Sequence, residues 1–128
     1  MSGVEILTKL ISFDIDGTLE VGDPPGYITM DMVRRAKWLG FIVGSCSDRM
    51  VSNQKRIWRD HDIPVHFTVL KHQLDLVKAE FDAEEYYHIG DTNMDRYYAE
   101  RAGFKYLLPG AGVERLWISQ SWVEPSRD

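Results

Sequence analysis

The chain has 128 residues, a net charge of −5 at neutral pH, 44% hydrophobic residues and 27% charged residues. This length fits one globular domain with enough apolar residues for a core, and the acidic balance argues against nucleic acid as a bulk electrostatic partner. The single cysteine, Cys46, excludes an internal disulfide, and no apolar stretch approaches the length needed to cross a bilayer. We therefore expect a cytoplasmic protein with no membrane partner.

The first predicted strand covers residues 10–16 and contains two carboxylates one residue apart, Asp14 and Asp16, at its carboxyl end. An apolar run leads into them, and Gly17 then allows the backbone to turn sharply. In open α/β sheets, ligands bind at the carboxyl edge of the strands. Two acids at such an edge can hold a divalent cation, or they can act as nucleophile and proton donor. Two solvated aspartates beside a turn are the alternative that this pair alone leaves open.

The rest of the chain alternates between helices and strands. Two prolines and a glycine indicate a loop over residues 20–28, and Thr29 can cap the next helix, which ends at Gly40. Further helices are expected over about 51–61, 74–81, 94–102 and 113–118, and strands over 10–16, 41–47, 65–70, 86–90 and 104–108. This alternation predicts a parallel five-stranded sheet with helices on both faces, a Rossmann-like three-layer α/β sandwich. Residues 1–128 form one domain in this interpretation, with residues 119–128 as a flexible tail.

A second acidic motif, Gly90-Asp91-Thr92-Asn93-Met94-Asp95, follows the fourth predicted strand. Its carboxylates lie four residues apart at the start of a helix. By itself the motif also fits a helix cap, with Asp91 or Asn93 as the N-cap residue and Asp95 in the first turn. His88, in the strand just before, is most simply a hydrogen-bonded core histidine.

Both acidic motifs resemble those of a known family. Asp-x-Asp-Gly-Thr-Leu at residues 14–19 resembles the first motif of the haloacid dehalogenase (HAD)-like superfamily, and Gly-Asp-x-x-x-Asp at residues 90–95 resembles its fourth motif, in the same chain order. Most members of that family are Mg²⁺-dependent phosphatases that work through an aspartyl-phosphate. The resemblance covers about residues 10–108 and implies the strand order 5-4-1-2-3. It also implies that Asp14, Asp91 and the backbone carbonyl of Asp16 bind Mg²⁺, with Asp95 as a direct, water-mediated or indirect ligand.

The two remaining motifs of the family are a serine or threonine after the second strand and a lysine. Ser47 fits the first better than Ser45, because it begins a Ser-Asp-Arg segment that resembles the Ser-Gly-Arg of some relatives. Lys71 follows the third strand directly and fits the second better than Lys78, which more simply points to solvent. The sequence alone does not decide between Ser47 and Ser45, or between Lys71 and Lys78. The resemblance implies that Ser47, Arg49 and Lys71 bind a phosphorylated substrate.

The implied reaction is phosphate-monoester hydrolysis. Asp14 would attack phosphorus, and Asp16 would protonate the leaving oxygen and then activate water. Mg²⁺, Lys71 and the Ser47 hydroxyl would hold the phosphoryl oxygens. The second aspartate disfavours a dehalogenase. A phosphotransferase with the same site, and a non-catalytic binding module on the same fold, are the alternatives.

The spacing between the motifs leaves no room for a cap domain. Residues 14–47 hold a loop and one helix, and residues 47–71 hold one helix and one strand. Capless members of the family tend to act on macromolecular substrates or to close the site with a neighbouring subunit. We therefore expect either a large phosphorylated substrate or a homo-oligomer, with the loop over 20–28 as a semi-rigid flap and Trp117 and Trp122 near the interface.

Overall fold

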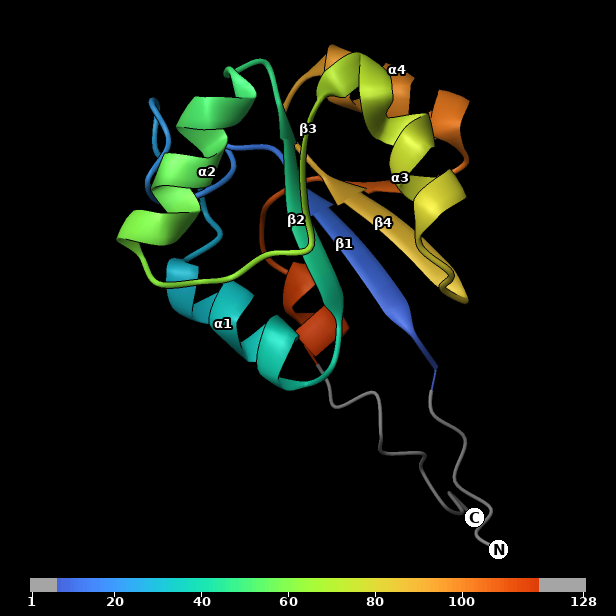
Figure 1. The fold of residues 1–128 in the computed structure, drawn as a ribbon, viewed down its shortest axis with the longest axis horizontal. Coiled ribbons are helices and arrows are strands. Elements are labelled where there is room, and N and C mark those ends of the chain that lie inside the picture. Colours follow the sequence, from blue (N-terminus) through green and yellow to red (C-terminus); the bar gives the residue numbers. More distant parts are fainter. Residues whose placement is uncertain (1–6, 118–128) are drawn as a thin grey trace, which may run out of the picture.

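Five parallel strands form a single sheet in the computed structural model, which describes residues 7–117. The sheet order is β3-β2-β1-β4-β5 (Figure 1), which is the predicted order 5-4-1-2-3 read from the other edge. The predicted fold class and strand order are therefore confirmed. The strands are β1 (Lys9–Phe13), β2 (Ile42–Ser47), β3 (Phe67–Leu70), β4 (Glu85–Ile89) and β5 (Lys105–Leu107).

Helices cover both faces of this sheet, and each face has its own apolar core. Leu10 packs in one core, while its neighbour Ile11 packs in the other, because successive side chains of a strand point to opposite faces. The core with Ile11 includes residues of α1, α2 and η2, and the core with Leu10 includes residues of α3 and α4. The helices are α1 (Met30–Trp38), α2 (Val51–Asp60), η1 (Lys71–Gln73), α3 (Leu74–Glu80), α4 (Asn93–Ala102) and η2 (Val113–Trp117), of which η1 and η2 are 3₁₀ helices.

The first strand is shorter than predicted. β1 ends at Phe13, because the chain turns directly after Asp14 and the backbone N–H groups of Thr18 and Leu19 both donate to the carbonyl of Ile15, at 3.1 and 2.9 Å. Gly17 permits this turn with a φ of 78°. The prediction of a strand over 10–16 was wrong at this end, and Asp16 belongs to the turn.

Other boundaries differ by a few residues. The predicted strand over 65–70 begins at Phe67, and the predicted helix over 113–118 is, as far as the described residues reach, the 3₁₀ helix η2 (Val113–Trp117). Thr29 caps α1 as predicted, because its hydroxyl accepts from the backbone N–H of Met32 at 3.0 Å. The predicted tail over 119–128, with Trp122, lies outside the described residues.

Backbone hydrogen bonds join the loop over residues 20–28 to the turn after β1. Gly17 donates to the carbonyl of Pro24 at 2.6 Å, and Ile28 donates to the carbonyl of Thr18 at 2.9 Å. The Tyr27 hydroxyl also reaches the carboxylate of Glu114 in η2. The loop is thus held along its length, and it forms a fixed wall beside the carboxyl end of β1.

Trp117 is a core residue and not a surface one. Its side chain is 6% exposed, its ring packs against Phe13, and its indole N–H donates to the carbonyl of Met32. The expectation that Trp117 lies at a subunit interface was therefore wrong.

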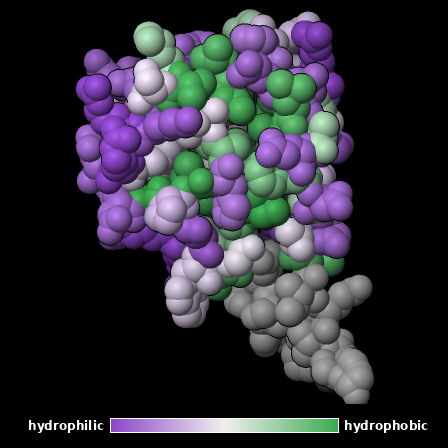
Figure 2. Space-filling view, viewed as in Figure 1, coloured by the Kyte–Doolittle hydropathy of each residue, from purple (hydrophilic) through white to green (hydrophobic). Residues whose placement is uncertain are grey.

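Apolar surface is visible along the middle of the face that carries the edge strand β3, between hydrophilic flanks (Figure 2).

No domain is inserted between the strands that carry the motifs, as predicted. The chain from β1 to β2 forms the loop and α1, and the chain from β2 to β3 contains α2 and a short connection. Among residues 7–117, we find no helix with both the length and the apolar character needed to span a membrane.

Candidate active site at the carboxyl edge of the sheet

The carboxyl ends of four neighbouring strands bring the predicted site residues to one edge. Asp14 follows β1, Ser47 ends β2, Lys71 follows β3, and Asp91 follows β4 after Gly90. The connections from β1 and β4 leave toward opposite faces of the sheet, so this edge is a topological switch point. Parallel strand ends therefore explain why motifs far apart in the sequence meet here.

Three carboxylates gather at this edge. Asp14, Asp91 and Asp95 can each direct one oxygen so that all three oxygens lie within 4.8 Å of one another. Asp14 and Asp95 are buried and Asp91 is exposed. Within residues 7–117, the Asp91 carboxylate makes no hydrogen bond or ion pair, so its oxygens are open to a ligand. Such a set of carboxylate oxygens could hold a hard divalent cation.

The glycine of each acidic motif makes room for one of these carboxylates. A Cβ atom on Gly17 would lie 2.0 Å from Oδ2 of Asp91, and a Cβ atom on Gly90 would lie 2.3 Å from Cγ of Asp95. Any side chain at either position would push the acidic group away. The two motifs are therefore interlocked, since the glycine of the first makes space for the aspartate of the second.

Asp95 is held by more donors than any other carboxylate of the cluster. Its Oδ1 lies 2.9 Å from Nε2 of His88 and 3.3 Å from Nζ of Lys71, and its Oδ2 accepts from the backbone N–H and hydroxyl of Thr92 at 3.1 and 2.8 Å. Burial alone would raise the pKa of Asp95, but His88, Lys71 and Thr92 outweigh it and lower the pKa to about 2. With two donors on each oxygen, Asp95 is better placed to fix Lys71 than to bind a metal directly.

Thr92 is the N-cap residue of α4, because its hydroxyl accepts from the backbone N–H of Asp95. The alternative interpretation of the motif, with Asp91 or Asn93 as the cap, was therefore wrong. This arrangement leaves Asp91 free of any capping role.

His88 is a buried, hydrogen-bonded core histidine, as predicted. Its Nε2 carries the hydrogen toward Asp95, because an ionised carboxylate can only accept, and Nδ1 can then accept from the hydroxyl of Ser12 at 2.9 Å. Sequence reasoning missed this link from Ser12 to Asp95. The pairing of β1 with β4 sets Ser12 opposite His88, so the strand order together with the register is the signal that could have found it.

Lys71 lies among the carboxylates. It is 7% exposed, and its Nζ lies 3.3 Å from Asp95, 3.6 Å from Asp48 and 3.9 Å from Asp14. Burial disfavours its charge, but Asp14, Asp95 and Asp48 outweigh burial and raise the pKa of Lys71. Lys78, the alternative, is exposed and donates to the carbonyl of Gly103 at 3.3 Å.

The raised pKa of Asp14 indicates that the positive charge around this carboxyl group is too small to balance the neighbouring carboxylates. Burial, followed by repulsion from Asp95, raises the pKa of Asp14 to about 8, although Lys71 acts to lower it. An opposite charge close to a carboxylate favours its ionised form. A cation bound at the cluster would therefore restore Asp14 to the carboxylate form that a nucleophile needs.

The two candidate serines have different surroundings. The Ser45 hydroxyl donates to Gln54 at 2.6 Å and accepts from the Trp58 indole at 2.9 Å, so it is used in packing α2 against the sheet. The Ser47 hydroxyl accepts from the backbone N–H of Arg49 at 3.0 Å. Among residues 7–117 its hydrogen has no acceptor, and β2 places this buried hydroxyl at the edge of the sheet.

Asp16 lies apart from the three-carboxylate cluster and pairs with Arg49. The Arg49 Nε lies 3.2 and 3.1 Å from the two Asp16 oxygens, its Nη2 lies 2.6 Å from Oδ1, and the backbone N–H of Asp23 also donates to Oδ1. The hydrogen bond from Arg49 is the main reason that the pKa of Asp16 is lowered. Only the backbone carbonyl of Asp16 is left for the predicted metal role, because its side chain is engaged elsewhere.

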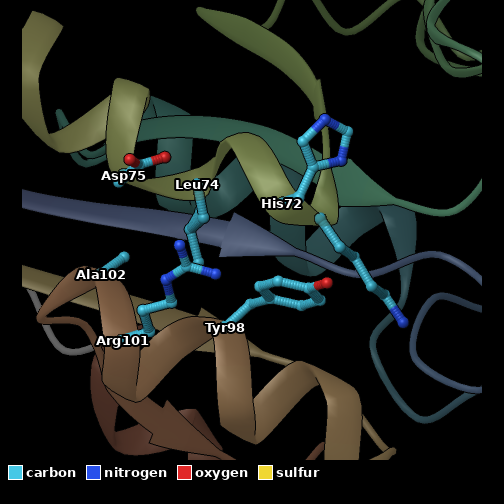
Figure 3. A pocket seen from close by; sticks show the side chains of 7 residues that line it. His72, Leu74, Asp75, Tyr98, Arg101 and Ala102 are labelled. Carbon is cyan, nitrogen blue, oxygen red and sulfur yellow. The ribbon is translucent and has the colours of Figure 1, made fainter.

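Two clefts flank the site. One holds about 270 Å³ between η1 and α4, and the other holds about 430 Å³ between the loop over 20–28 and the start of α2. Beside the first, a cavity of about 10 Å³, roughly the space of one water, lies where Tyr98 and Arg101 reach from α4 toward His72 and Leu74 (Figure 3). The first cleft is lined by Asp48, Leu70, Lys71, His72, Met94 and Tyr98, and the second by Asp16, Asp23, Arg49, Met50 and Asn53.

Comparison with known proteins adds no functional information. No protein-family model matches the sequence, and no curated protein matches it.

Proposed function

We propose that this chain is a Mg²⁺-dependent phosphatase of the HAD-like type, which hydrolyses a phosphate monoester through an aspartyl-phosphate on Asp14. The observation that carries the proposal is the meeting of Asp14, Asp91 and Lys71 at one sheet edge. A buried nucleophilic carboxylate there lies beside both a fixed ammonium group and a second carboxylate that has no partner within residues 7–117. Phosphoryl transfer requires this combination of a nucleophile and charge neutralisation.

The donor set fits Mg²⁺. Asp14 and Asp91 would supply carboxylate oxygens, and the Asp16 carbonyl would add a third oxygen, while Mg²⁺ typically keeps several waters and takes few protein ligands. When bound, the ion would neutralise the charge on the phosphoryl oxygens. Asp95 would act by holding Lys71 in place, since its own oxygens already accept from four donors.

The first half-reaction uses both aspartates of the first motif. A carboxylate oxygen of Asp14 forms a bond to phosphorus, and the bond from phosphorus to the leaving oxygen breaks. Asp16 gives its proton to that oxygen, so the alcohol departs neutral. Lys71 and the Ser47 hydroxyl hold the phosphoryl oxygens during the transfer.

The second half-reaction returns the enzyme to its starting state. Asp16, now ionised, takes a proton from water as the water oxygen attacks phosphorus, and the bond between phosphorus and Asp14 breaks to release phosphate. The pairing with Arg49 favours this ionised form of Asp16. The proton that Asp16 takes from water is the one that it gives to the leaving oxygen of the next substrate.

Hydrolysis of p-nitrophenyl phosphate with and without Mg²⁺ tests the proposal. We expect turnover that requires Mg²⁺ and falls by about 10³-fold or more in Asp14→Asn, because the amide is nearly isosteric but a poor nucleophile. Asp60→Asn, at an exposed position in α2, is the matched control and should keep full activity. Full activity in folded Asp14→Asn would remove Asp14 from this role. Product analysis with added alcohols separates hydrolysis from phosphotransfer, which uses the same residues.

The open site also requires closure. No inserted domain lies over it within residues 7–117, and the loop over 20–28 is fixed to its own turn. A large phosphorylated substrate or a second copy of the chain would supply the missing cover. Light scattering at the assay concentration shows whether a second copy is present. A monomer with full activity on a small ester would need neither form of cover.

A further inference from the structure

The second cleft, of about 430 Å³, is a shallow depression open to solvent, and it lies on the side of the site from which the leaving group would depart. Asp16, the proton donor of the proposed function, lines this cleft, and the leaving oxygen must come within hydrogen-bond reach of Asp16. The alcohol part of the substrate would therefore extend along the other lining residues. These are Asp23 from the loop, and Arg49, Met50 and Asn53 from the start of α2.

Arg49 is held in this cleft with donors to spare. A guanidinium group has five N–H donors in a planar fork. The Nε–H and one Nη2–H are directed to Asp16, and one Nη1–H is directed to Oδ1 of Asn53 at 2.9 Å. One N–H on Nη1 and one on Nη2 have no acceptor within the described part of the chain. The Arg49 side chain is 27% exposed, so a ligand can reach them.

Asn53 adds donors of the same kind. Its Oδ1 accepts from Arg49, which orients the side-chain amide and leaves its two N–H groups without an acceptor among residues 7–117. Arg49 is also the only cationic side chain that lines this cleft, while Asp16 and Asp23 carry the opposite charge. A ligand with a planar anionic group can accept hydrogen bonds from the unused N–H groups of Arg49 and Asn53. The carboxylates of Asp16 and Asp23 repel such a group from the rest of the cleft.

We propose that Arg49 and Asn53 form a subsite for a carboxylate on the leaving group, so that the preferred substrates are phosphorylated hydroxy acids. The proposal rests on the proposed function for the position of the phosphoryl group. Two binding partners hold Arg49 in the protein, so little side-chain freedom is lost when the carboxylate binds. The exposed Met50 gives the alkyl part of the acid an apolar surface.

Matched pairs of esters test the subsite. Each pair has a phosphooxy carboxylic acid and the alkyl phosphate of the same chain length, and the measured quantity is the ratio of their kcat/KM values. A hydrogen bond to a charged group contributes about 1.5–3 kcal/mol, which corresponds to a ratio of about 10 to 150 in favour of the acid at the best chain length. The ratio cancels any effect of Arg49 on Asp16, because both members of a pair need the same proton donor.

Three variants define the expected result. Arg49→Gln should bring the ratio close to one, and Arg49→Lys, which keeps the charge but loses the fork, should give an intermediate ratio. Arg35→Gln removes an equal charge from the exposed surface of α1 and should leave the ratio unchanged. A ratio of one or less at every chain length in the wild-type protein overturns the subsite, and so does a ratio that survives in Arg49→Gln.

Binding measurements separate this proposal from the proposed function. Calorimetry with the Asp14→Asn protein and Mg²⁺ measures the Kd of each ester in a pair without turnover. A preference for the acid in Kd that disappears in the Asp14→Asn, Arg49→Gln double variant supports the subsite even if the wild-type protein hydrolyses no ester. Equal Kd values within every pair, together with hydrolysis of both members, would reject the subsite and keep the phosphatase.

Discussion

The two halves of the candidate site hold their carboxylates in opposite ways. Asp95 is fully buried and accepts from His88, Thr92 and Lys71, all of which are held by the fold. The Asp16 side chain is 38% exposed, and its main partner is the side chain of Arg49 on the next strand end. The buried half therefore fixes the charges around the phosphoryl position, whereas the exposed half depends on an ion pair between two partly exposed side chains.

The largest loss of stability is expected when the buried half is disturbed. Asp95→Asn should lower the free energy of unfolding by about 3 kcal/mol or more, because the amide cannot accept from all the donors that Asp95 satisfies and Lys71 loses its nearest counter-charge. Urea unfolding measures this effect, with exposed Asp60→Asn as the control. A variant as stable as the wild-type protein would show that the network does not hold this half of the site.

Asp91 tests the open side of the same cluster. Asp91→Ala should weaken Mg²⁺ binding by about 10-fold or more, because a direct ligand is lost. The stability of the metal-free protein should hardly change, since the Asp91 carboxylate has no partner within residues 7–117. Calorimetric titration and thermal unfolding measure the two effects. An unchanged Mg²⁺ affinity would mean that Asp91 is not a ligand.

Within the buried half, the raised pKa of Asp14 should make the stability of the protein depend on pH. The folded pKa of Asp14 is raised to about 8 from an ordinary value of 3.8, so the folded state binds this proton more tightly than the unfolded state. The stability that this proton contributes is complete below about pH 4 and is lost as the pH rises through about 8. The Tm of the metal-free protein should fall over this range, and the fall should be smaller in Asp14→Asn or with Mg²⁺. Identical profiles for the variant and the wild-type protein would contradict the raised pKa.

A small effect on stability is also expected in the exposed half. Arg49→Gln should cost no more than about 1 kcal/mol of unfolding free energy, because a solvent-exposed ion pair gains little and is screened by salt. The same urea experiment measures it beside Asp95→Asn. A loss as large as that of Asp95→Asn would mean that the two halves do not differ in the way described.

Sequence reasoning reached the elements of the site better than their contacts. Hydrophobic patterning placed Asp14, Ser47 and Lys71 at the ends of strands, and the ends of parallel strands must meet at one edge. The strand order and the choice of Ser47 and Lys71 came from the family resemblance. The pairing of Asp16 with Arg49 depends on the turn that ends β1 at Phe13, and patterning alone extended that strand too far.

The network around Asp95 was beyond sequence reasoning for a different reason. It requires His88 on β4 to sit opposite Ser12 on β1, and register between strands that are distant in the chain is not encoded in local periodicity. Trp117 was misplaced similarly, since a tryptophan near the end of a chain gives no local sign that it packs against Phe13.

Detection of the covalent intermediate tests most directly whether Asp14 is the nucleophile. The wild-type protein with Mg²⁺ and an ester carrying radiolabelled phosphate should be quenched in acid during turnover. We predict label on the protein that is stable in acid, is released by hydroxylamine as an acyl phosphate requires, maps to the peptide of Asp14 and is absent from Asp14→Asn. Turnover without any such label under rapid quenching, or equal labelling of Asp14→Asn, would show that Asp14 is not the nucleophile.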